Sequence, residues 1–277
     1  MKALVAGSSQ RLVCRVLGVA RSRLASRPHA TAAARRAVDS ELTERIRFLI
    51  QANPVHGYRL LTAWLRNDGV IVNRKRVYRV LKLKGWLVHQ RPVSPRPRVH
   101  SMVSRAKASN ERWAMDVTHI PCGRDGWGHL AAVITCHDRE ILGFEFALRG
   151  RAKEAERALE EACIHRFGTL RPPGPTPTVR SDNGLIFQSR RFRAACKDYR
   201  LRQEYITPYT PQQNGLIERF FRTLKEECVW QHVFTDFTHA RREILSWIAR
   251  YNAPRPHSAL GYKSPAEYRA QQEPLVA

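Results

Sequence analysis

Three acidic residues stand in contexts that could support chemistry at phosphorus. Asp182 and Glu218 are separated by 35 residues, and Asp116 precedes both. Hard divalent cations take oxygen ligands, and two ions about 4 Å apart activate both the attacking and the leaving oxygen of a phosphoryl transfer. The three acids therefore predict a two-metal site, with three unrelated surface acids as the alternative. Their contexts are Trp113-Ala-Met-Asp-Val-Thr-His119, Val179-Arg-Ser-Asp-Asn-Gly184 and Pro211-Gln-Gln-Asn-Gly-Leu-Ile-Glu-Arg219.

Positive charge is concentrated at the front of this 277-residue chain, which has room for about two domains. Residues 1–110 hold 23 Lys or Arg against 4 Asp or Glu, a net charge of +19. Residues 111–277 hold 25 against 20, a net charge of +5. Such basic charge favours nucleic-acid binding through counterion release. A membrane surface would also attract it, but no apolar run approaches the roughly 18 residues that a span requires.

The six cysteines are scattered and form no Cys-x-x-Cys pair. This spacing argues against a zinc site and a disulfide framework, and it fits a reducing cytoplasm. The Arg- and Ala-rich first 38 residues resemble a transit peptide only superficially, because Arg11 and Arg15 interrupt the apolar run. Residues 11–22 instead predict a helix, a glycine turn and a second helix.

The basic region that follows is predicted to be helical. Ser40 is the predicted N-cap of a helix with one apolar face. A second helix is predicted over residues 58–67, and a third over residues 74–84, with Asn73 as its N-cap and Gly85 as its end.

The third of these helices has two different faces. One is apolar, and the other carries Lys75, Arg79 and Lys82 at helical spacing. Such a basic stripe suits a DNA groove, although a merely solvated face is the alternative. Residues 91–109 contain three prolines and few apolar residues, which indicates a basic linker.

From Arg112 the hydrophobic period changes from that of a helix to that of a strand. Alternation predicts a first strand with Asp116 on the face opposite Trp113 and Met115. Thr210 is predicted to open a late helix with a capping-box-like sequence, with Asn214 as the other possible cap. The further elements are predicted as strands over 129–136, 141–148, 178–180 and 205–207, and as helices over 152–167 and 189–199.

This order of elements predicts how the three acids meet. The first and fourth strands can be central neighbours, which would bring Asp116 and Asp182 together. The late helix would then lay Glu218 across them. The predicted fold class is α/β, with a mixed sheet flanked by helices, preceded by all-α DNA-binding segments.

Several sequence motifs follow one another in a characteristic order. They are Trp113-Ala-Met-Asp-Val-Thr118, Ser181-Asp-Asn-Gly184, Thr210-Pro-Gln-Gln-Asn-Gly215, Glu218-Arg-Phe-Phe-Arg-Thr-Leu-Lys-Glu226 and Tyr251-Asn-Ala-Pro-Arg-Pro-His-Ser-Ala-Leu-Gly-Tyr262, preceded by His56-Gly-Tyr-Arg59 and Val77-Tyr-Arg-Val-Leu81. Taken together, these motifs resemble the second-frame (OrfB-type) transposases of the IS-three group of bacterial insertion sequences, with the last two in the helix-turn-helix region of that family. The resemblance covers essentially the whole chain and implies a ribonuclease-H-like, retroviral-integrase-like catalytic core.

The resemblance implies roles for individual residues. Asp116, Asp182 and Glu218 match the catalytic, metal-binding acids, which would hold two Mg2+ or Mn2+ ions. Lys225 matches a basic position that would contact a phosphate beside the metals, with a solvated lysine as the alternative. Structural roles are expected for the turn residues Asn183, Gly184, Asn214 and Gly215, and for His119 and His257.

The resemblance also implies partners and a domain plan. The partners are double-stranded DNA, both the terminal repeats of the element and the target, and the upstream-frame transposase protein or a fused form of it. A homo-oligomer on DNA is expected, in the bacterial cytoplasm at the nucleoid, and no membrane partner. The expected domains are an N-terminal helix-turn-helix segment (1–38), a three-helix DNA-binding unit (39–90), the linker (91–109) and the catalytic core with a helical tail (110–270).

Two features of related enzymes are absent from the sequence. The chain has no His-His-Cys-Cys spacing like the N-terminal zinc unit of retroviral integrases, and it has no leucine-zipper heptads. The predicted activity is cleavage at the element ends followed by 3′-OH strand transfer. A metal-dependent nuclease without joining activity and a catalytically silent competitor for the ends are the alternatives.

Overall fold

The structure of the chain is a computed structural model, and it describes residues 10–16, 18, 32–88, 106–208 and 210–272. The chain divides into two units, Met1–Phe48 and Leu49–Ala277. The first unit contains α1 (Gln10–Val16) and the larger part of α3 (Ala32–Ala52). The second helix predicted within residues 11–22 and most of the predicted linker lie outside the described residues.

The predicted N-cap Ser40 is wrong, because α3 begins at Ala32 and Ser40 lies inside it. The segment before Ser40 is rich in alanine and arginine, which are among the best helix formers, so the helix extends past a residue that often caps one. The apolar face predicted for this helix is confirmed: Leu42, Ile46 and Leu49 are buried.

The second unit begins with the helices predicted after Gly57. Helix α4 spans Tyr58–Asn67 and α5 spans Arg74–Lys84, as predicted. The side chain of Asn73 accepts a hydrogen bond from the backbone N–H of Lys75, and Gly85 ends α5 with a φ of 70°. Both ends of α5 are thus closed by the residues that commonly close helices.

A five-stranded mixed sheet forms the core of the second unit, in the order β3-β2-β1-β4-β5. The first three strands are antiparallel neighbours, whereas β4 runs parallel to both β1 and β5. The prediction that the first and fourth strands are neighbours is confirmed. The strands are β1 (Arg112–Pro121), β2 (Trp127–Thr135), β3 (Ile141–Ala147), β4 (Thr178–Ser181) and β5 (Arg202–Tyr205).

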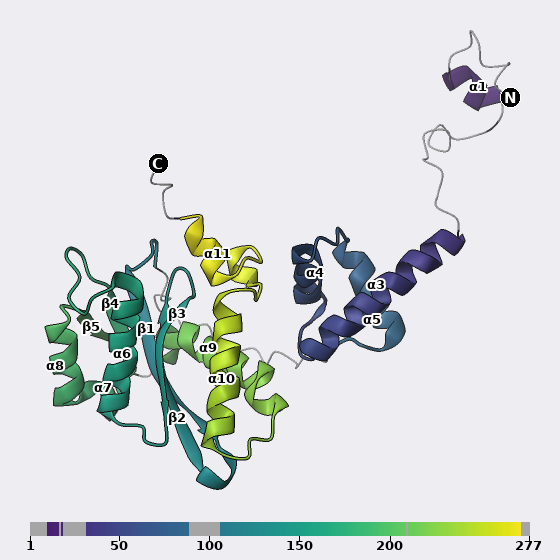
Figure 1. Cartoon of the computed structure of the whole chain (residues 1–277). Coiled ribbons are helices and arrows are strands. Elements are labelled where there is room, and N and C mark those ends of the chain that lie inside the picture. Colours follow the sequence, from purple (N-terminus) through teal and green to yellow (C-terminus); the bar gives the residue numbers. More distant parts are fainter. Residues whose placement is uncertain (1–9, 17, 19–31, 89–105, 209, 273–277) are drawn as a thin grey trace. The chain divides into compact units, whose positions relative to one another are not determined.

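Helices cover both faces of this sheet (Figure 1). One buried cluster joins the sheet to α6 and α8, and the other joins it to α9 and α10. Trp113 and Met115 of β1 belong to the first cluster and Ala114 belongs to the second. The helices are α6 (Ala152–Phe167), α7 (Leu185–Gln188), α8 (Arg190–Asp198), α9 (Gly215–Glu227), α10 (Phe237–Asn252) and α11 (Pro265–Ala270), with short 3-10 turns at Gly123–Asp125, Pro211–Asn214, Val229–Gln231 and Ser258–Leu260.

Two predicted boundaries around the late helix are wrong. The last strand covers Arg202–Tyr205 rather than residues 205–207, because it pairs through its backbone with β4 and carries no apolar run that would reveal it. Thr210 forms no cap, since its hydroxyl donates to the carbonyl of Pro208 and a 3-10 turn follows. Helix α9 begins at Gly215, so Asn214, the other predicted cap, occupies the N-cap position, although its side chain makes no capping hydrogen bond.

All six cysteines are free and buried, as the scattered spacing predicts. Within the described ranges, none of the helices combines the length and the apolar character that crossing a membrane would require.

Candidate active site

Asp116, inside β1, and Asp182, just after the end of β4, lie at the same level on neighbouring strands. Ala114 of β1 is paired with Arg180 of β4, and the two acids follow these residues by two positions each. Side chains alternate along a strand, so Asp116 shares the face of Ala114, which packs toward α9 and α10. The parallel pairing thus brings together two acids that are 66 positions apart.

The turn after β4 holds the carboxylate of Asp182. Its Oδ1 accepts a hydrogen bond of 2.9 Å from the backbone N–H of Gly184. Asn183 fixes the same turn, because its side-chain amide donates to the carbonyl of Ile206 at 2.9 Å. Asn183 and Gly184 therefore shape the strand end, the structural role expected of them.

Helix α9 supplies the third acid from its first turn. Glu218 is exposed, and Lys225 follows it by two helical turns on the same face. Asn214, just before the helix, is 2% exposed and its side-chain amide donates to the carbonyl of Met115 at 3.5 Å. This contact ties the start of α9 to the strand residue that precedes Asp116.

The pKa of Asp116 depends on its burial and on the charges of the other three residues. Burial is the main cause that raises its pKa to about 7, and the hydrogen bond from the backbone N–H of Val117 opposes the rise. The negative charges of Asp182 and Glu218 raise the pKa further, whereas the positive charge of Lys225 lowers it. The four residues predicted from the sequence thus share one electrostatic environment.

The donor chemistry of this environment fits a divalent cation. Three carboxylates offer hard oxygen ligands, and a cation would offset the negative charges that Asp182 and Glu218 place on Asp116. The buried Oδ1 of Asn214 has no hydrogen-bond partner within the part of the chain described, which leaves a further oxygen acceptor at the start of α9. In the same part, no three His, Cys, Asp or Glu side chains are already gathered closely enough to hold a metal. The three acids therefore share one environment without forming a ligand cage among the described residues.

The segment between β5 and α9 is held in place by residues that were not predicted from the sequence. Arg180 donates from Nη1 to the carbonyl of Gln213 at 3.2 Å, and it forms a bidentate ion pair with the carboxylate of Glu204. The Gln213 side chain in turn accepts from the N–H of Thr207 at 2.8 Å. A buried arginine in a four-residue strand was the available signal, because a charge in such a position needs a partner.

The other residues singled out from the sequence lie apart from the acids. His119 is exposed and points from β1 to the face opposite Asp116, where its ring meets that of His129. His257 is buried and its Nε2 bonds to the carbonyl of Tyr251, a packing role as expected. The basic stripe of α5 is a separate exposed row, formed by Lys75, Arg79 and Lys82.

Substituting Gly184 by alanine should damage catalysis without unfolding the protein. A Cβ at position 184 would lie 2.9 Å from Oδ1 of Asp182, so the carboxylate has to move away. We expect Gly184→Ala to slow the metal-dependent DNA cleavage predicted from the sequence at least about tenfold, because displacing a group that acts in a reaction by a small distance has effects of this size. Gly215→Ala is the matched control, since a Cβ there meets nothing within 4 Å. Equal cleavage rates for the two variants would contradict this role of Gly184.

Three known domain families match consecutive parts of the chain. An HTH-like domain matches residues 37–92. Two integrase core domain families match residues 106–211 and residues 199–265, and together they contain all three acids.

Curated relatives and solved structures agree with these matches. The chain is 30% identical over 241 residues to the transposase InsD for insertion element IS2A/D/F/H/I/K of Escherichia coli, covering 84% of this chain and 80% of that protein. It is equally similar to InsD for insertion element IS2-9 of strain K12, covering 78% of that protein. A chain of the simian T-cell lymphotropic virus intasome, solved with PP2A regulatory subunit B56 gamma, shares the fold with a TM-score of 0.52 and 19% identity, over 80% of this chain and 73% of that chain.

Proposed function

The chain belongs to the family of insertion-element transposases with an integrase core domain, which are DDE-type polynucleotidyl transferases, and on this premise we propose that Asp116, Asp182 and Glu218 are its catalytic acids. The observation that carries the proposal is the shared environment of the three carboxylates: two lie at one level on adjacent parallel strands, and the charge of the third acts on Asp116 from α9. The members of this family are metal-dependent.

The proposed reaction is a pair of displacements at phosphorus. Water first attacks a phosphodiester at an element end: a P–O bond forms to the water oxygen, the bond to the 3′ oxygen breaks, and the 3′ oxygen takes a proton. That 3′-OH then attacks a target phosphodiester and displaces its 3′ oxygen. One P–O bond forms and one breaks in each step, so no protein nucleophile and no further energy source is needed.

The residues of this chain would bind and orient the reacting groups. Asp116, Asp182 and Glu218 would hold two Mg2+ or Mn2+ ions, which when bound supply positive charge at the attacking and leaving oxygens. Lys225 would contact a phosphate beside them, since it shares the face of Glu218. The bonds of Arg180 and Gln213 would keep the entry to α9 in place while DNA binds.

An assay with labelled element ends tests the proposed function. The full chain would be incubated with Mg2+ and duplex DNA from the ends of its own element, and nicking and joining would be scored separately. Nicking followed by joining supports a transposase. Nicking alone would indicate a nuclease, and end binding without either would indicate a silent competitor.

Recognition of DNA ends is proposed to reside in the helix-turn-helix region, with α5 as the helix that meets the duplex. Its exposed face carries Lys75, Arg79 and Lys82, while its other face is buried. The expected partners are double-stranded DNA, as terminal repeats and as target, and the upstream-frame protein or a fused form of it. We further propose that the chain acts as a homo-oligomer on DNA in the bacterial cytoplasm.

Removing the charges of α5 should weaken DNA binding in a salt-dependent way. We expect the triple variant Lys75→Gln, Arg79→Gln, Lys82→Gln to lower the slope of log affinity against log salt by up to about 3, since each lost phosphate contact contributes about 0.9. Fluorescence anisotropy with an end duplex at several salt concentrations measures this slope. The control removes three exposed charges elsewhere, with Lys153→Gln, Lys197→Gln and Arg241→Gln. The same slope change in both variants would remove α5 from the DNA interface.

A further inference from the structure

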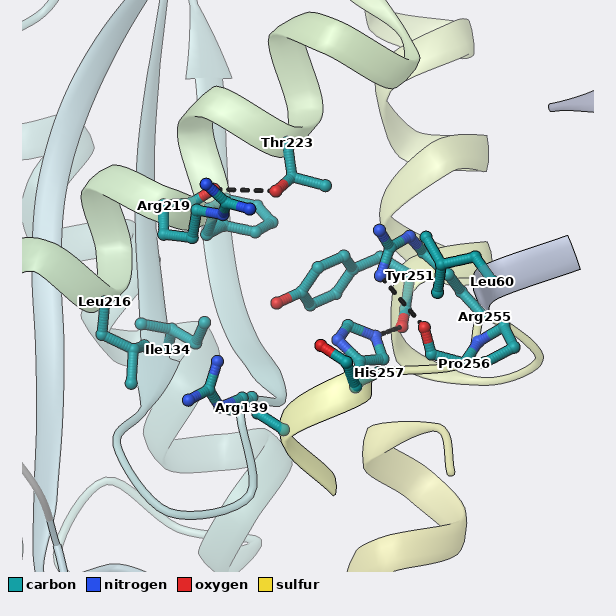
Figure 2. Close-up of a pocket in the computed structure, with 13 residues that line it drawn as sticks. Leu60, Ile134, Arg139, Leu216, Arg219, Thr223, Tyr251, Arg255, Pro256 and His257 are labelled. Atoms are coloured by element: carbon teal, nitrogen blue, oxygen red, sulfur yellow. Dashed lines mark hydrogen bonds between the residues drawn. The ribbon is translucent and has the colours of Figure 1, made fainter. Parts of the chain in front are cut away.

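A small basic cavity lies on the side of α9 away from the three acids. It has a volume of about 150 Å³ and is shown in Figure 2. Leu216, Phe220 and Thr223 line it from α9, on the face opposite Glu218 and Lys225. The end of β2 with the turn after it, the end of α10 with the segment that follows, and Leu60 of α4 complete the wall. The cavity is thus separate from the proposed active site, although one helix serves both.

Three arginines line this cavity, and two of them have uncompensated charge. Arg255 is paired with Glu227, with one contact of 2.8 Å, so its charge is largely neutralised. Arg139 and Arg219 form no ion pair within the residues that the structure describes. His257 adds no charge at neutral pH, because burial and the nearby Arg255 lower its pKa to about 4. The net charge offered to an occupant is therefore positive.

Arg139 stands in a backbone conformation that favours glycine. Its φ is 60°, and it is half-buried in the turn after β2. A residue with a side chain pays roughly 1–2 kcal/mol for this conformation. Backbone strain of this kind is concentrated at functional sites, so the strain at Arg139 favours a ligand-binding role for its side chain. In Figure 2 the guanidinium of Arg139 reaches from the turn toward Arg219 and Tyr251.

The Tyr251 hydroxyl gives the cavity a neutral hydrogen-bond donor. The Tyr251 ring packs between buried aromatic side chains of α9 and α10, and its hydroxyl points into the space between Arg219 and Arg139 (Figure 2). Burial raises the pKa of Tyr251 to about 12, so the hydroxyl keeps its proton at neutral pH. It makes no hydrogen bond to any of the described residues. The guanidinium groups of Arg139 and Arg219 and the hydroxyl of Tyr251 thus line the same small cavity.

We infer that this cavity binds one backbone phosphate of a DNA duplex, held by Arg139, Arg219 and the hydroxyl of Tyr251. The inference rests on the proposed function, which supplies DNA as the polyanion that this chain of net charge +24 meets. The volume equals that of about five water molecules, room for one phosphate group but not for a base with its sugar. Guanidinium groups match the geometry of phosphate oxygens, and hydrogen bonds between two charged groups are stronger than those between neutral groups. The cavity would hold DNA at a point beyond the catalytic acids.

Three variants of the full chain test this contact. Arg139→Gly removes the charge and keeps the positive φ, Arg219→Gln removes the second charge, and Tyr251→Phe removes only the hydroxyl. We expect each arginine variant to bind an end duplex about tenfold more weakly and to lower the salt slope by about 1. Tyr251→Phe should weaken binding about fivefold with an unchanged salt slope, because its contact is neutral. Arg241→Gln, an exposed arginine on α10, is the matched control.

Modified DNA identifies the contacted phosphate. In a series of end duplexes, each duplex carries one neutral methylphosphonate in place of a phosphate. At one position this replacement should weaken binding by the wild type about tenfold. The same replacement should not weaken binding by Arg219→Gln further, because that variant has already lost the contact. Arginine variants that behave like Arg241→Gln would overturn the inference, as would a Tyr251→Phe variant with wild-type affinity. Nicking and joining by the wild type are measured in parallel. If the wild type nicks and joins DNA while the variants bind normally, this inference fails but the proposed function does not. If an arginine variant does not fold, the affinity of Tyr251→Phe for the end duplex tests the inference instead.

Discussion

Replacing any one of Asp116, Asp182 or Glu218 by its amide is expected to abolish both nicking and joining. The variants Asp116→Asn, Asp182→Asn and Glu218→Gln keep the shape of the side chain but remove a charged ligand from the proposed site. We expect each to lower both rates by about three orders of magnitude or more, since the groups that stabilise charge in a transition state have effects of this size. The readout is the cleavage and strand-transfer assay with labelled element ends and Mg2+.

End binding should survive in all three variants, because it is assigned to the basic helices. Asp198→Asn is a suitable control, since Asp198 is an exposed carboxylate at the end of α8. A triad variant that retains near-normal strand transfer would remove that residue from the site. Loss of DNA binding together with activity would instead indicate that the substitution disturbs more than metal binding.

The meeting of Asp116 and Asp182 could be predicted because it depends on local patterns. Alternation in residues 113–117 identifies a strand and the face on which Asp116 lies. The short strand before Asp182 is bounded by turn residues. Two parallel neighbours then bring the acids together, and the register of β1 with β4 confirms this arrangement.

The boundaries that were mispredicted depend on contacts that a local pattern does not contain. The last strand is held by backbone pairing to β4, so its own side chains need not be apolar. Ser40 and Thr210 are good capping residues, but neighbouring residues determine whether a helix begins there. Local preferences of this kind are weak and are overridden by tertiary context.

The supports of the site could not be predicted because they join segments distant in sequence. Arg180 and Gln213 are 33 positions apart, and nothing in either local sequence identifies the other as its partner. The basic cavity is more extreme, since Arg139, Arg219 and Tyr251 come from three separate elements. In the sequence alone, Arg139 and Arg219 cannot be distinguished from solvated surface charges, and only the fold shows that they line one cavity.

The metal-free protein is expected to lose stability as pH rises toward neutral. Burial, aided by the charges of Asp182 and Glu218, raises the pKa of Asp116 from 3.8 to about 7. The folded state therefore holds a proton that the unfolded state releases near pH 4. Its stabilising contribution is complete below that pH and is lost as pH rises through about 7. The difference in melting temperature between wild type and Asp116→Asn, followed from pH 4 to pH 8 in chelator, isolates this effect from other titrating groups.

Adding Mn2+ should reverse the loss, because the cation supplies the positive charge that the three carboxylates lack. At about a hundred times its Kd, a metal that binds only the folded state adds about 2.7 kcal/mol, which corresponds to about 5–10 °C in melting temperature. The gain should be larger at pH 8 than at pH 5, where the proton on Asp116 competes with the metal. Asp116→Asn has lost one charged ligand, so its gain should be much smaller at both pH values. An equal gain in the variant and the wild type would mean that Asp116 is not a ligand, whatever its effect on catalysis.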